Sequence, residues 1–257
     1  MEKHPYRKKY EKNLATYADN IVTLHTTRHP LLSPTFPTML HIQTFTNNPL
    51  EENTYVVHDA TKQAVIIDCG ALTKQERATI RQYVFDNGLT LCYALLTHGH
   101  FDHIFGAQWV FDEFGVRPCL MEADLPLYRK GCLQLREMFG THLQFEVPEA
   151  DHTLSDGDVV SFGHHHLRVI ATPGHTPGGC CFFSPTEPCV LFSGDSLFCG
   201  SIGRTDFPGG SLSMLVESLK KQVLTLPAST IVYPGHGPAT TIQHEQESNF
   251  YFRNDNT

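Results

Sequence analysis

The chain has 257 residues, of which 40% are hydrophobic and 18% charged, so it can bury a sizeable core. Its formal net charge of −8 disfavours nucleic acid as a partner, because phosphate backbones are bound by basic surfaces. No apolar stretch is long enough to cross a membrane, and the polar start does not resemble a secretion signal, so we expect a cytoplasmic protein without a membrane partner.

Eight cysteines are spread along the chain, several of them inside apolar, strand-like runs. A chain of this length does not need disulfides, so we expect buried free thiols in a reducing compartment. None of the cysteines has CxxC spacing, which disfavours a structural zinc site built from them.

Residues 1–38 differ in composition from the rest of the chain. Charged residues crowd the start, three prolines lie between His29 and Pro37, and there is no sustained periodicity. We predict a poorly ordered N-terminal extension over residues 1–38 and a single catalytic domain over residues 39–257.

Apolar runs after residue 39 predict strands that alternate with helices. The predicted strands cover residues 39–45, 54–57, 64–67, 91–96, 159–162, 167–171, 180–183, 189–192 and 230–233. One helix is predicted from the capping box of Thr73 and Glu76 to Gly88, and two more over residues 104–114 and 211–226. Residues 117–150 are expected to hold a short strand and a helix. This order predicts an α/β sandwich.

The stretch Thr97-His98-Gly99-His100-Phe101-Asp102-His103 directly follows a predicted buried strand. Positions two apart in an extended loop face the same side, so His98 and His100 can reach one ion. Asp102 and His103 lie where a helix begins and can hold a second ion. Imidazole and carboxylate are the ligands of catalytic zinc or non-haem iron sites. Surface histidines on a polar loop are the alternative, which four such side chains behind a buried strand disfavour.

The same pattern of a strand, a glycine or proline bend and a histidine or aspartate recurs along the chain. Loops that leave a sandwich at one edge come together, so we predict one cluster there. The candidate ligands are His98, His100, Asp102, His103, His175, Asp195 and His236. They suit two divalent ions with three contacts each, and Asp195 is the natural bridge because a carboxylate has two oxygens. Individually, Asp195 and His236 have ordinary alternatives as caps of turns or helices.

Two neighbouring ions lower the pKa of bound water, so that hydroxide is available near neutral pH, and polarise a carbonyl or phosphoryl oxygen. This predicts metal-assisted hydrolysis without a protein nucleophile, with Asp102 and Asp195 in the catalytic set. Asp68 is predicted to accept the other N–H of a ligand histidine, with a simple turn carboxylate as the alternative. The run His164–His166 falls at a predicted hairpin turn, and we interpret it as solvated rather than metal-binding.

These motifs resemble the metallo-β-lactamase superfamily over residues 39 to about 245. The resemblance implies a four-layer αββα sandwich with a dimetal site at one edge of its two sheets. It implies a first metal held by His98, His100 and His175. It implies a second metal held by Asp102, His103 and His236, with Asp195 bridging the two. Zinc is the expected metal, with iron or manganese as alternatives.

Three segments, Thr172–Gly178, Gly194–Phe198 and Gly203–Asp206, resemble the glyoxalase II (hydroxyacylglutathione hydrolase) branch. The short bacterial members, which lack the C-terminal helical domain, are the most similar. This implies hydrolysis of a small-molecule thioester such as S-lactoylglutathione. Arg204 is the candidate to bind a substrate carboxylate, because a guanidinium pairs with it bidentately; an internal ion pair with Asp206 is the alternative.

A persulfide dioxygenase with one iron is the alternative enzyme class, because that branch is similar in the Gly203–Asp206 loop and shares His175 and Asp195. Lactam hydrolysis is disfavoured, since the lactamases most similar in fold carry a cysteine at the Asp195 position. The acidic balance disfavours a nuclease. A non-enzymatic scaffold is disfavoured because the ligand set leaves open metal positions.

Overall fold

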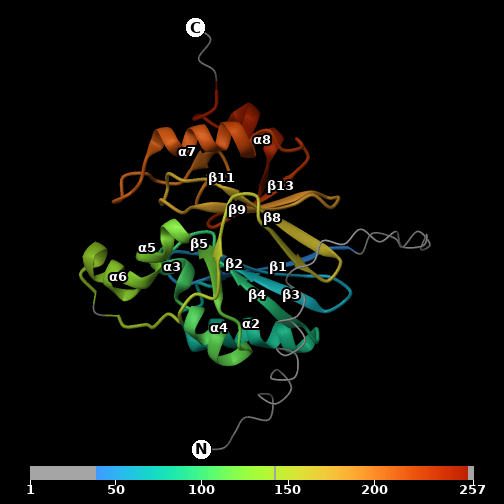
Figure 1. The fold of residues 1–257 in the computed structure, drawn as a ribbon, viewed down its shortest axis with the longest axis vertical. Coiled ribbons are helices and arrows are strands. Elements are labelled where there is room, and N and C mark those ends of the chain that lie inside the picture. Colours follow the sequence, from blue (N-terminus) through green and yellow to red (C-terminus); the bar gives the residue numbers. More distant parts are fainter. Residues whose placement is uncertain (1–38, 142, 254–257) are drawn as a thin grey trace, which may run out of the picture. The chain divides into compact units, whose positions relative to one another are not determined.

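The computed structural model describes residues 39–141 and 143–253, which form two facing β-sheets with helices on their outer faces (Figure 1). Helices α2 (Lys74–Asp86) and α4 (Ala107–Phe114) cover the first sheet, and α7 (Leu212–Ser218) and α8 (Ile242–Ser248) cover the second. This architecture confirms the predicted four-layer αββα sandwich in a single domain. The predicted extension over residues 1–38 lies outside the described residues.

The first sheet has the strand order β1-β2-β3-β4-β5-β6. Its strands are β1 (His41–Asn47), β2 (Glu52–His58), β3 (Gln63–Ile67), β4 (Thr90–Leu95), β5 (Pro118–Met121) and β6 (Thr153–Leu154). The first three strands are antiparallel, and β3 to β6 run parallel. The parallel strand β4 runs directly into the histidine-rich loop.

The second sheet has the order β14-β13-β10-β9-β8-β7. Its strands are β7 (Val159–Phe162), β8 (His165–Ala171), β9 (Cys180–Ser184), β10 (Val190–Gly194), β13 (Ile231–Pro234) and β14 (Thr240–Thr241). Only the β10–β13 pair is parallel among the pairs of this sheet. A small separate pair, β11 (Leu197–Phe198) and β12 (Ser201–Ile202), follows β10.

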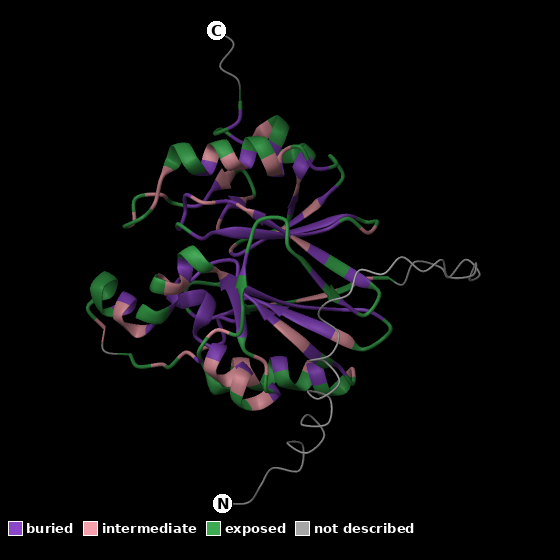
Figure 2. Ribbon diagram, viewed as in Figure 1, coloured by how far each residue is buried: buried purple, intermediate pink, exposed green. Residues whose placement is uncertain are grey.

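The three largest apolar clusters fill the spaces between the layers. The central cluster joins the inner faces of the sheets through side chains such as Val57, Leu95, Phe182 and Phe192. The other two pack α2 and α4 on the first sheet, and α7 and α8 on the second. Figure 2 shows this pattern as buried strands between helices that are exposed on their outward sides.

Helix α2 begins and ends where the sequence predicts. Thr73 and Glu76 form the capping box, Ile80 and Val84 are buried, and the chain leaves the helix at Gly88 with φ of 62°. The single helix predicted over residues 104–114 is wrong, because α3 (Phe101–Ile104) and α4 are separate helices. The break lies at Gly106, whose N–H donates to the Cys69 carbonyl at 2.8 Å.

Residues 117–150 hold more helix than predicted. After β5 come the 3-10 helix η1 (Glu122–Asp124), α5 (Leu125–Lys130) and α6 (Cys132–Phe139). Gly131 separates α5 from α6 with φ of 44°. The helix predicted over residues 211–226 is α7, which continues as the π-helix η2 (Leu219–Val223).

Of the histidine run, His164 lies in the turn between β7 and β8, and β8 begins at His165, for which the solvated interpretation is wrong. That residue is buried at the start of β8, because its side chain faces the core side of the hairpin beside Phe162. All eight cysteines are free thiols and five of them are buried, whereas Cys92, Cys132 and Cys199 are not; the reducing compartment stays a prediction. Among the helices of residues 39–141 and 143–253, none is long and apolar enough to cross a membrane.

Candidate metal centre

The seven side chains predicted as ligands meet at one edge of the sandwich, and four loops supply them. The loop after β4 and helix α3 contribute His98, His100, Asp102 and His103, while His175, Asp195 and His236 follow β8, β10 and β13. Strand ends from both sheets therefore converge on one cluster.

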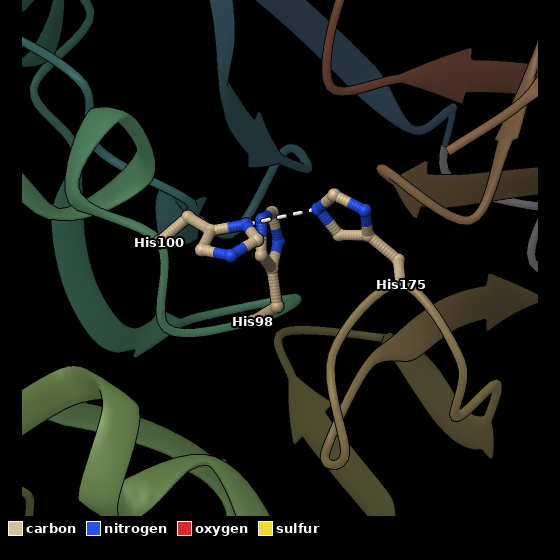
Figure 3. A group of neighbouring side chains, drawn as sticks. All are labelled: His98, His100 and His175. Carbon is tan, nitrogen blue, oxygen red and sulfur yellow. Dashed lines mark hydrogen bonds between the residues drawn. The ribbon is translucent and has the colours of Figure 1, made fainter. Parts of the chain in front are cut away.

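His98, His100 and His175 form the first group, with one ring nitrogen of each within 4.8 Å of the others. Figure 3 shows His98 and His100 on one loop and His175 on the loop that faces it. Nδ1 of His100 lies 2.9 Å from Nε2 of His175. Two imidazole nitrogens bound to one tetrahedral zinc ion are about 3.3 Å apart, so the rings are close to ligand separation.

Asp102, His103 and His236 form the second group. Oδ2 of Asp102 lies 3.3 Å from Nε2 of His236 and 3.8 Å from Nε2 of His103. The second group contains one carboxylate and two imidazoles, which is a suitable ligand set for a hard or borderline divalent ion.

Asp195 lies between the two groups, and its two oxygens face different sides. Oδ2 lies 3.4 Å from Nε2 of His175, in the first group. Oδ1 lies 3.3 Å from Nε2 of His103 and 3.7 Å from Nε2 of His236, in the second group. This is the arrangement that a bridging carboxylate requires.

Buried hydrogen bonds fix the rings of His103 and His98. Nδ1 of His103 lies 2.9 Å from Oδ2 of Asp68, and Nδ1 of His98 lies 3.0 Å from Oγ1 of Thr97. Thr97 in turn donates its hydroxyl and its N–H to Asp68, each at 2.8 Å. Both rings are therefore held through Nδ1, which leaves Nε2 directed at the cluster.

Main-chain carbonyls hold the rings of His175 and His236 in the same way. Nδ1 of His175 donates to the Arg204 carbonyl at 2.7 Å, and Nδ1 of His236 donates to the Leu50 carbonyl at 2.9 Å. These partners were not predicted from sequence, since a carbonyl belongs to every residue and leaves no compositional signal.

Buried atoms without partners lie at the centre of this arrangement. His98 Nε2, His103 Nε2 and Asp195 Oδ1 have no hydrogen-bond partner in the described part of the chain. A buried polar atom without a partner is costly, and cations held by the two groups of ligands would satisfy all three atoms. The residues present therefore fit a metal pair.

The protonation states of the first group also suit a metal. Burial, with a smaller contribution from His103, lowers the pKa of His98 well below its ordinary value. Burial, followed by the charge of His175, lowers the pKa of His100 to about 3. Both rings are neutral near pH 7, as a metal ligand must be.

The carboxylates around His103 attract positive charge. Burial opposes the protonation of His103, but Asp195 and Asp68 raise its pKa well above the ordinary value. Burial likewise opposes ionisation of Asp195, but His103 holds its pKa well below the usual range. A divalent cation would supply the same compensation for these carboxylates.

Several residues that the sequence analysis missed hold the ligand loops. Nδ2 of Asn48 donates to the carbonyls of Gly70 and Asp102, at 3.0 and 3.1 Å. The Tyr55 hydroxyl donates to the Pro234 carbonyl at 2.6 Å, just before His236. Asn48 follows a second asparagine and precedes a proline, which signals a turn but not a role at the centre.

The side chain of Arg204 takes the alternative position that the sequence allowed. It donates two hydrogen bonds to Asp206, at 2.8 and 2.7 Å, and lies 3.8 Å from the centre of the Phe207 ring. The Phe207 ring in turn lies edge-on to His100 at 5.6 Å. A contact between Arg204 and substrate stays a prediction.

The sequence model of the metallo-beta-lactamase superfamily matches residues 47–236, which include all seven candidate ligands. The chain belongs to this superfamily. The superfamily relatives include probable metallo-hydrolase YqgX of Bacillus subtilis, 35% identical over 78% of this chain and 92% of that protein. Hydroxyacylglutathione hydrolase GloC of Haemophilus influenzae is 33% identical over 82% of this chain and 97% of that protein. The mitochondrial persulfide dioxygenase ETHE1 of Bos taurus is 33% identical over 76% of this chain and 69% of that protein.

A solved structure of similar fold contains two metal ions. The crystal structure of TTHA1623 in a di-iron-bound form matches with a TM-score of 0.71 and 36% identity, over 81% of this chain and 99% of that one. Superfamily membership, the relatives and the histidine–aspartate cluster together indicate a metallo-hydrolase.

Proposed function

We propose that this chain is a dimetal hydrolase that cleaves the thioester of a small thiol, with S-lactoylglutathione as the first candidate substrate. The observation that carries the proposal is the position of Asp195, whose two oxygens face the two groups of ligands. The similarity to the Haemophilus influenzae hydroxyacylglutathione hydrolase supports the thioester class.

In this proposal His98, His100 and His175 hold one ion, Asp102, His103 and His236 hold the other, and Asp195 contacts both. Two metal ions held there would lower the pKa of a bound water and would polarise the acyl oxygen of the substrate. Zinc is the proposed metal, with iron or manganese as alternatives, because imidazole and carboxylate ligands suit all three.

The exposure of the ligands indicates the side from which substrate enters. The side chain of His236 is 25% exposed and that of Asp102 is 11% exposed, whereas His103 is fully buried. Substrate and water therefore approach past His236 and Asp102. On that side Asp102 is the carboxylate that can take the proton of the attacking water, while Asp195 holds the two ions. Water adds to the acyl carbon, the C–S bond breaks, and the products are a carboxylic acid and a free thiol.

The test is the release of free thiol from S-lactoylglutathione by the metal-loaded protein. We expect turnover in the wild type and its loss in His100→Ala and Asp195→Ala, each of which removes a ligand. His152→Ala is the matched control, because the His152 side chain is 62% exposed and lies outside the cluster. If protein shown to carry two metal ions releases no thiol, the proposed thioester substrate is overturned. If the protein instead carries a single iron ion and consumes oxygen when it is given a persulfide, it is a dioxygenase.

A further inference from the structure

Asp124, the last residue of η1, is fully buried and its carboxylate accepts three hydrogen bonds. Oδ2 accepts from the N–H of Gly99 and from the Thr176 hydroxyl, both at 2.8 Å. Oδ1 accepts from the N–H of Gly178 at 2.6 Å. The function proposed above gives this carboxylate no role.

The donors belong to the two loops that carry the first group of histidines. Gly99 lies between His98 and His100, on the loop that leaves the first sheet. Thr176 directly follows His175, on the loop between β8 and β9 of the second sheet. A single carboxylate therefore joins the two sheets at the point where His100 and His175 approach to 2.9 Å.

Close packing fixes both loops against the segment from η1 to α6. A Cβ atom on Gly178 would lie 2.6 Å from the Asp124 nitrogen, and one on Gly99 would lie 2.8 Å from the Tyr128 nitrogen. From the other side, Nε2 of Gln134 donates to the Gly99 carbonyl at 2.9 Å. The loops are thus held from several directions, and the side chain of Asp124 accepts hydrogen bonds from both.

We infer that Asp124 is a positioning residue, which sets the separation between the His98–His100 loop and the His175 loop and so tunes metal affinity at the first group. It acts through Gly99, Thr176 and Gly178. The inference rests on the proposed function only in that these three histidines bind a metal; it does not depend on the substrate.

Asp124→Asn tests the link, because an amide has one acceptor oxygen in place of two. In either orientation its NH2 group faces at least one of the donors that the carboxylate satisfies. Thr176→Val is a milder second variant, which removes one donor and keeps Asp124 itself.

Asp59 provides a matched control. It is also buried and also accepts from two backbone N–H groups and a hydroxyl, those of Thr61 and His164. It likewise joins hairpins of the two sheets, but it precedes β3, whereas Asp68 and the metal cluster lie beyond the other end of that strand. Asp59→Asn therefore reproduces the loss of a buried carboxylate away from the cluster.

The experiment titrates Co²⁺ into metal-free wild type and the variants. It follows the visible absorption spectrum, competition with a chelator, and the unfolding midpoint of the metal-free protein. Repeating the titration with His236→Ala, which lacks a ligand of the second group, isolates binding at the first. We expect Asp124→Asn to weaken that binding by about 10- to 100-fold and to change the spectrum. Thr176→Val should weaken metal binding less than Asp124→Asn does. Asp59→Asn should bind metal as the wild type does, even if its unfolding midpoint falls as far as that of Asp124→Asn.

Wild-type affinity and spectrum in both Asp124→Asn and Thr176→Val would overturn the inference, as would an equal loss of affinity in Asp59→Asn. If Asp124→Asn does not fold, Thr176→Val decides the question alone. A wild type that binds no metal would overturn this inference and the dimetal proposal together. Weakened binding in Asp124→Asn, alongside a wild type that does not cleave S-lactoylglutathione, would reject only the proposed substrate.

Discussion

Oδ2 of Asp68 lies 2.9 Å from Nδ1 of His103, and both side chains are buried. Asp68 adopts a φ of 53°, in the left-handed region that aspartate and asparagine tolerate better than most residues. The chain bends there at the end of β3, which places the carboxylate against the side of His103 that faces away from the cluster.

This contact predicts the effect of Asp68→Asn. The variant keeps the shape of the side chain and its tolerance of positive φ, but the amide is a weaker acceptor for His103 and for Thr97. We expect metal affinity at the second group to fall about 10- to 100-fold, as measured by equilibrium dialysis with metal analysis. Asp112→Asn, on the exposed side of α4, is the control. Unchanged affinity would show that Asp68 is only a turn carboxylate.

The two groups of ligands predict an asymmetry between His236→Ala and Asp195→Ala. His236 belongs to one group, so its loss should leave about one equivalent of tightly bound metal. Asp195 faces both groups, so its loss should weaken both ions. Because changes in residues that merely hold a ligand already cost 10- to 100-fold, we expect activity to fall by more than about 100-fold in both variants. If the two variants retain the same number of bound metal ions per chain, Asp195 does not bridge the two ions.

Gly70→Ala should destabilise the metal-free protein. An added Cβ would lie 2.2 Å from Oε2 of Glu52, 2.4 Å from the Asp102 carbonyl oxygen and 2.6 Å from Nδ2 of Asn48. Overpacking of this kind costs about 1–3 kcal/mol, to be measured by urea unfolding. Gly88→Ala is the comparison, since it has φ of 62° and open space around it, so it tests backbone strain without a clash. Gly70→Ala should also weaken metal binding, whereas Gly88→Ala should not.

The contribution of Asp59 to stability should depend on pH. Burial opposes its ionisation, but hydrogen bonds from Thr61 and the His164 N–H hold the pKa of Asp59 below its ordinary value. A pKa lower in the folded than in the unfolded state stabilises the protein above the unfolded value of about 3.9, and this contribution is lost as the pH falls through the folded value. In metal-free protein, Asp59→Asn should lose about 1–3 kcal/mol at pH 7 and progressively less below about pH 4. A loss of equal size at all pH values would argue against this linkage.

Patterns in the sequence were sufficient to predict most of the strands and the members of the cluster, whereas the four-layer arrangement was implied by the resemblance to the superfamily. Strands with period-two or continuous apolar character end at the bends that carry His98, His175, Asp195 and His236, and strand ends share an edge of a sandwich. The capping box at Thr73 marks the start of α2 because both of its bonds are local.

The features that the sequence did not predict depend on contacts between distant segments. Asp124 is an ordinary acid between η1 and α5, and its role follows only from where Gly99 and Gly178 fold. The break between α3 and α4 depends on Cys69, which packs against Gly106 from an earlier loop. Such features carry no periodic or motif signal.

The two sheets each supply part of the metal centre, and the last candidate ligand, His236, follows β13 near the end of the second sheet. The histidine-rich loop therefore leaves the ribosome long before its partners at His175, Asp195 and His236 have been made. If the cluster holds two ions as proposed, a nascent chain that ends before His236 should bind metal only weakly. We then expect full affinity only once the second sheet has docked on the first, and release of the ions together with separation of the two sheets.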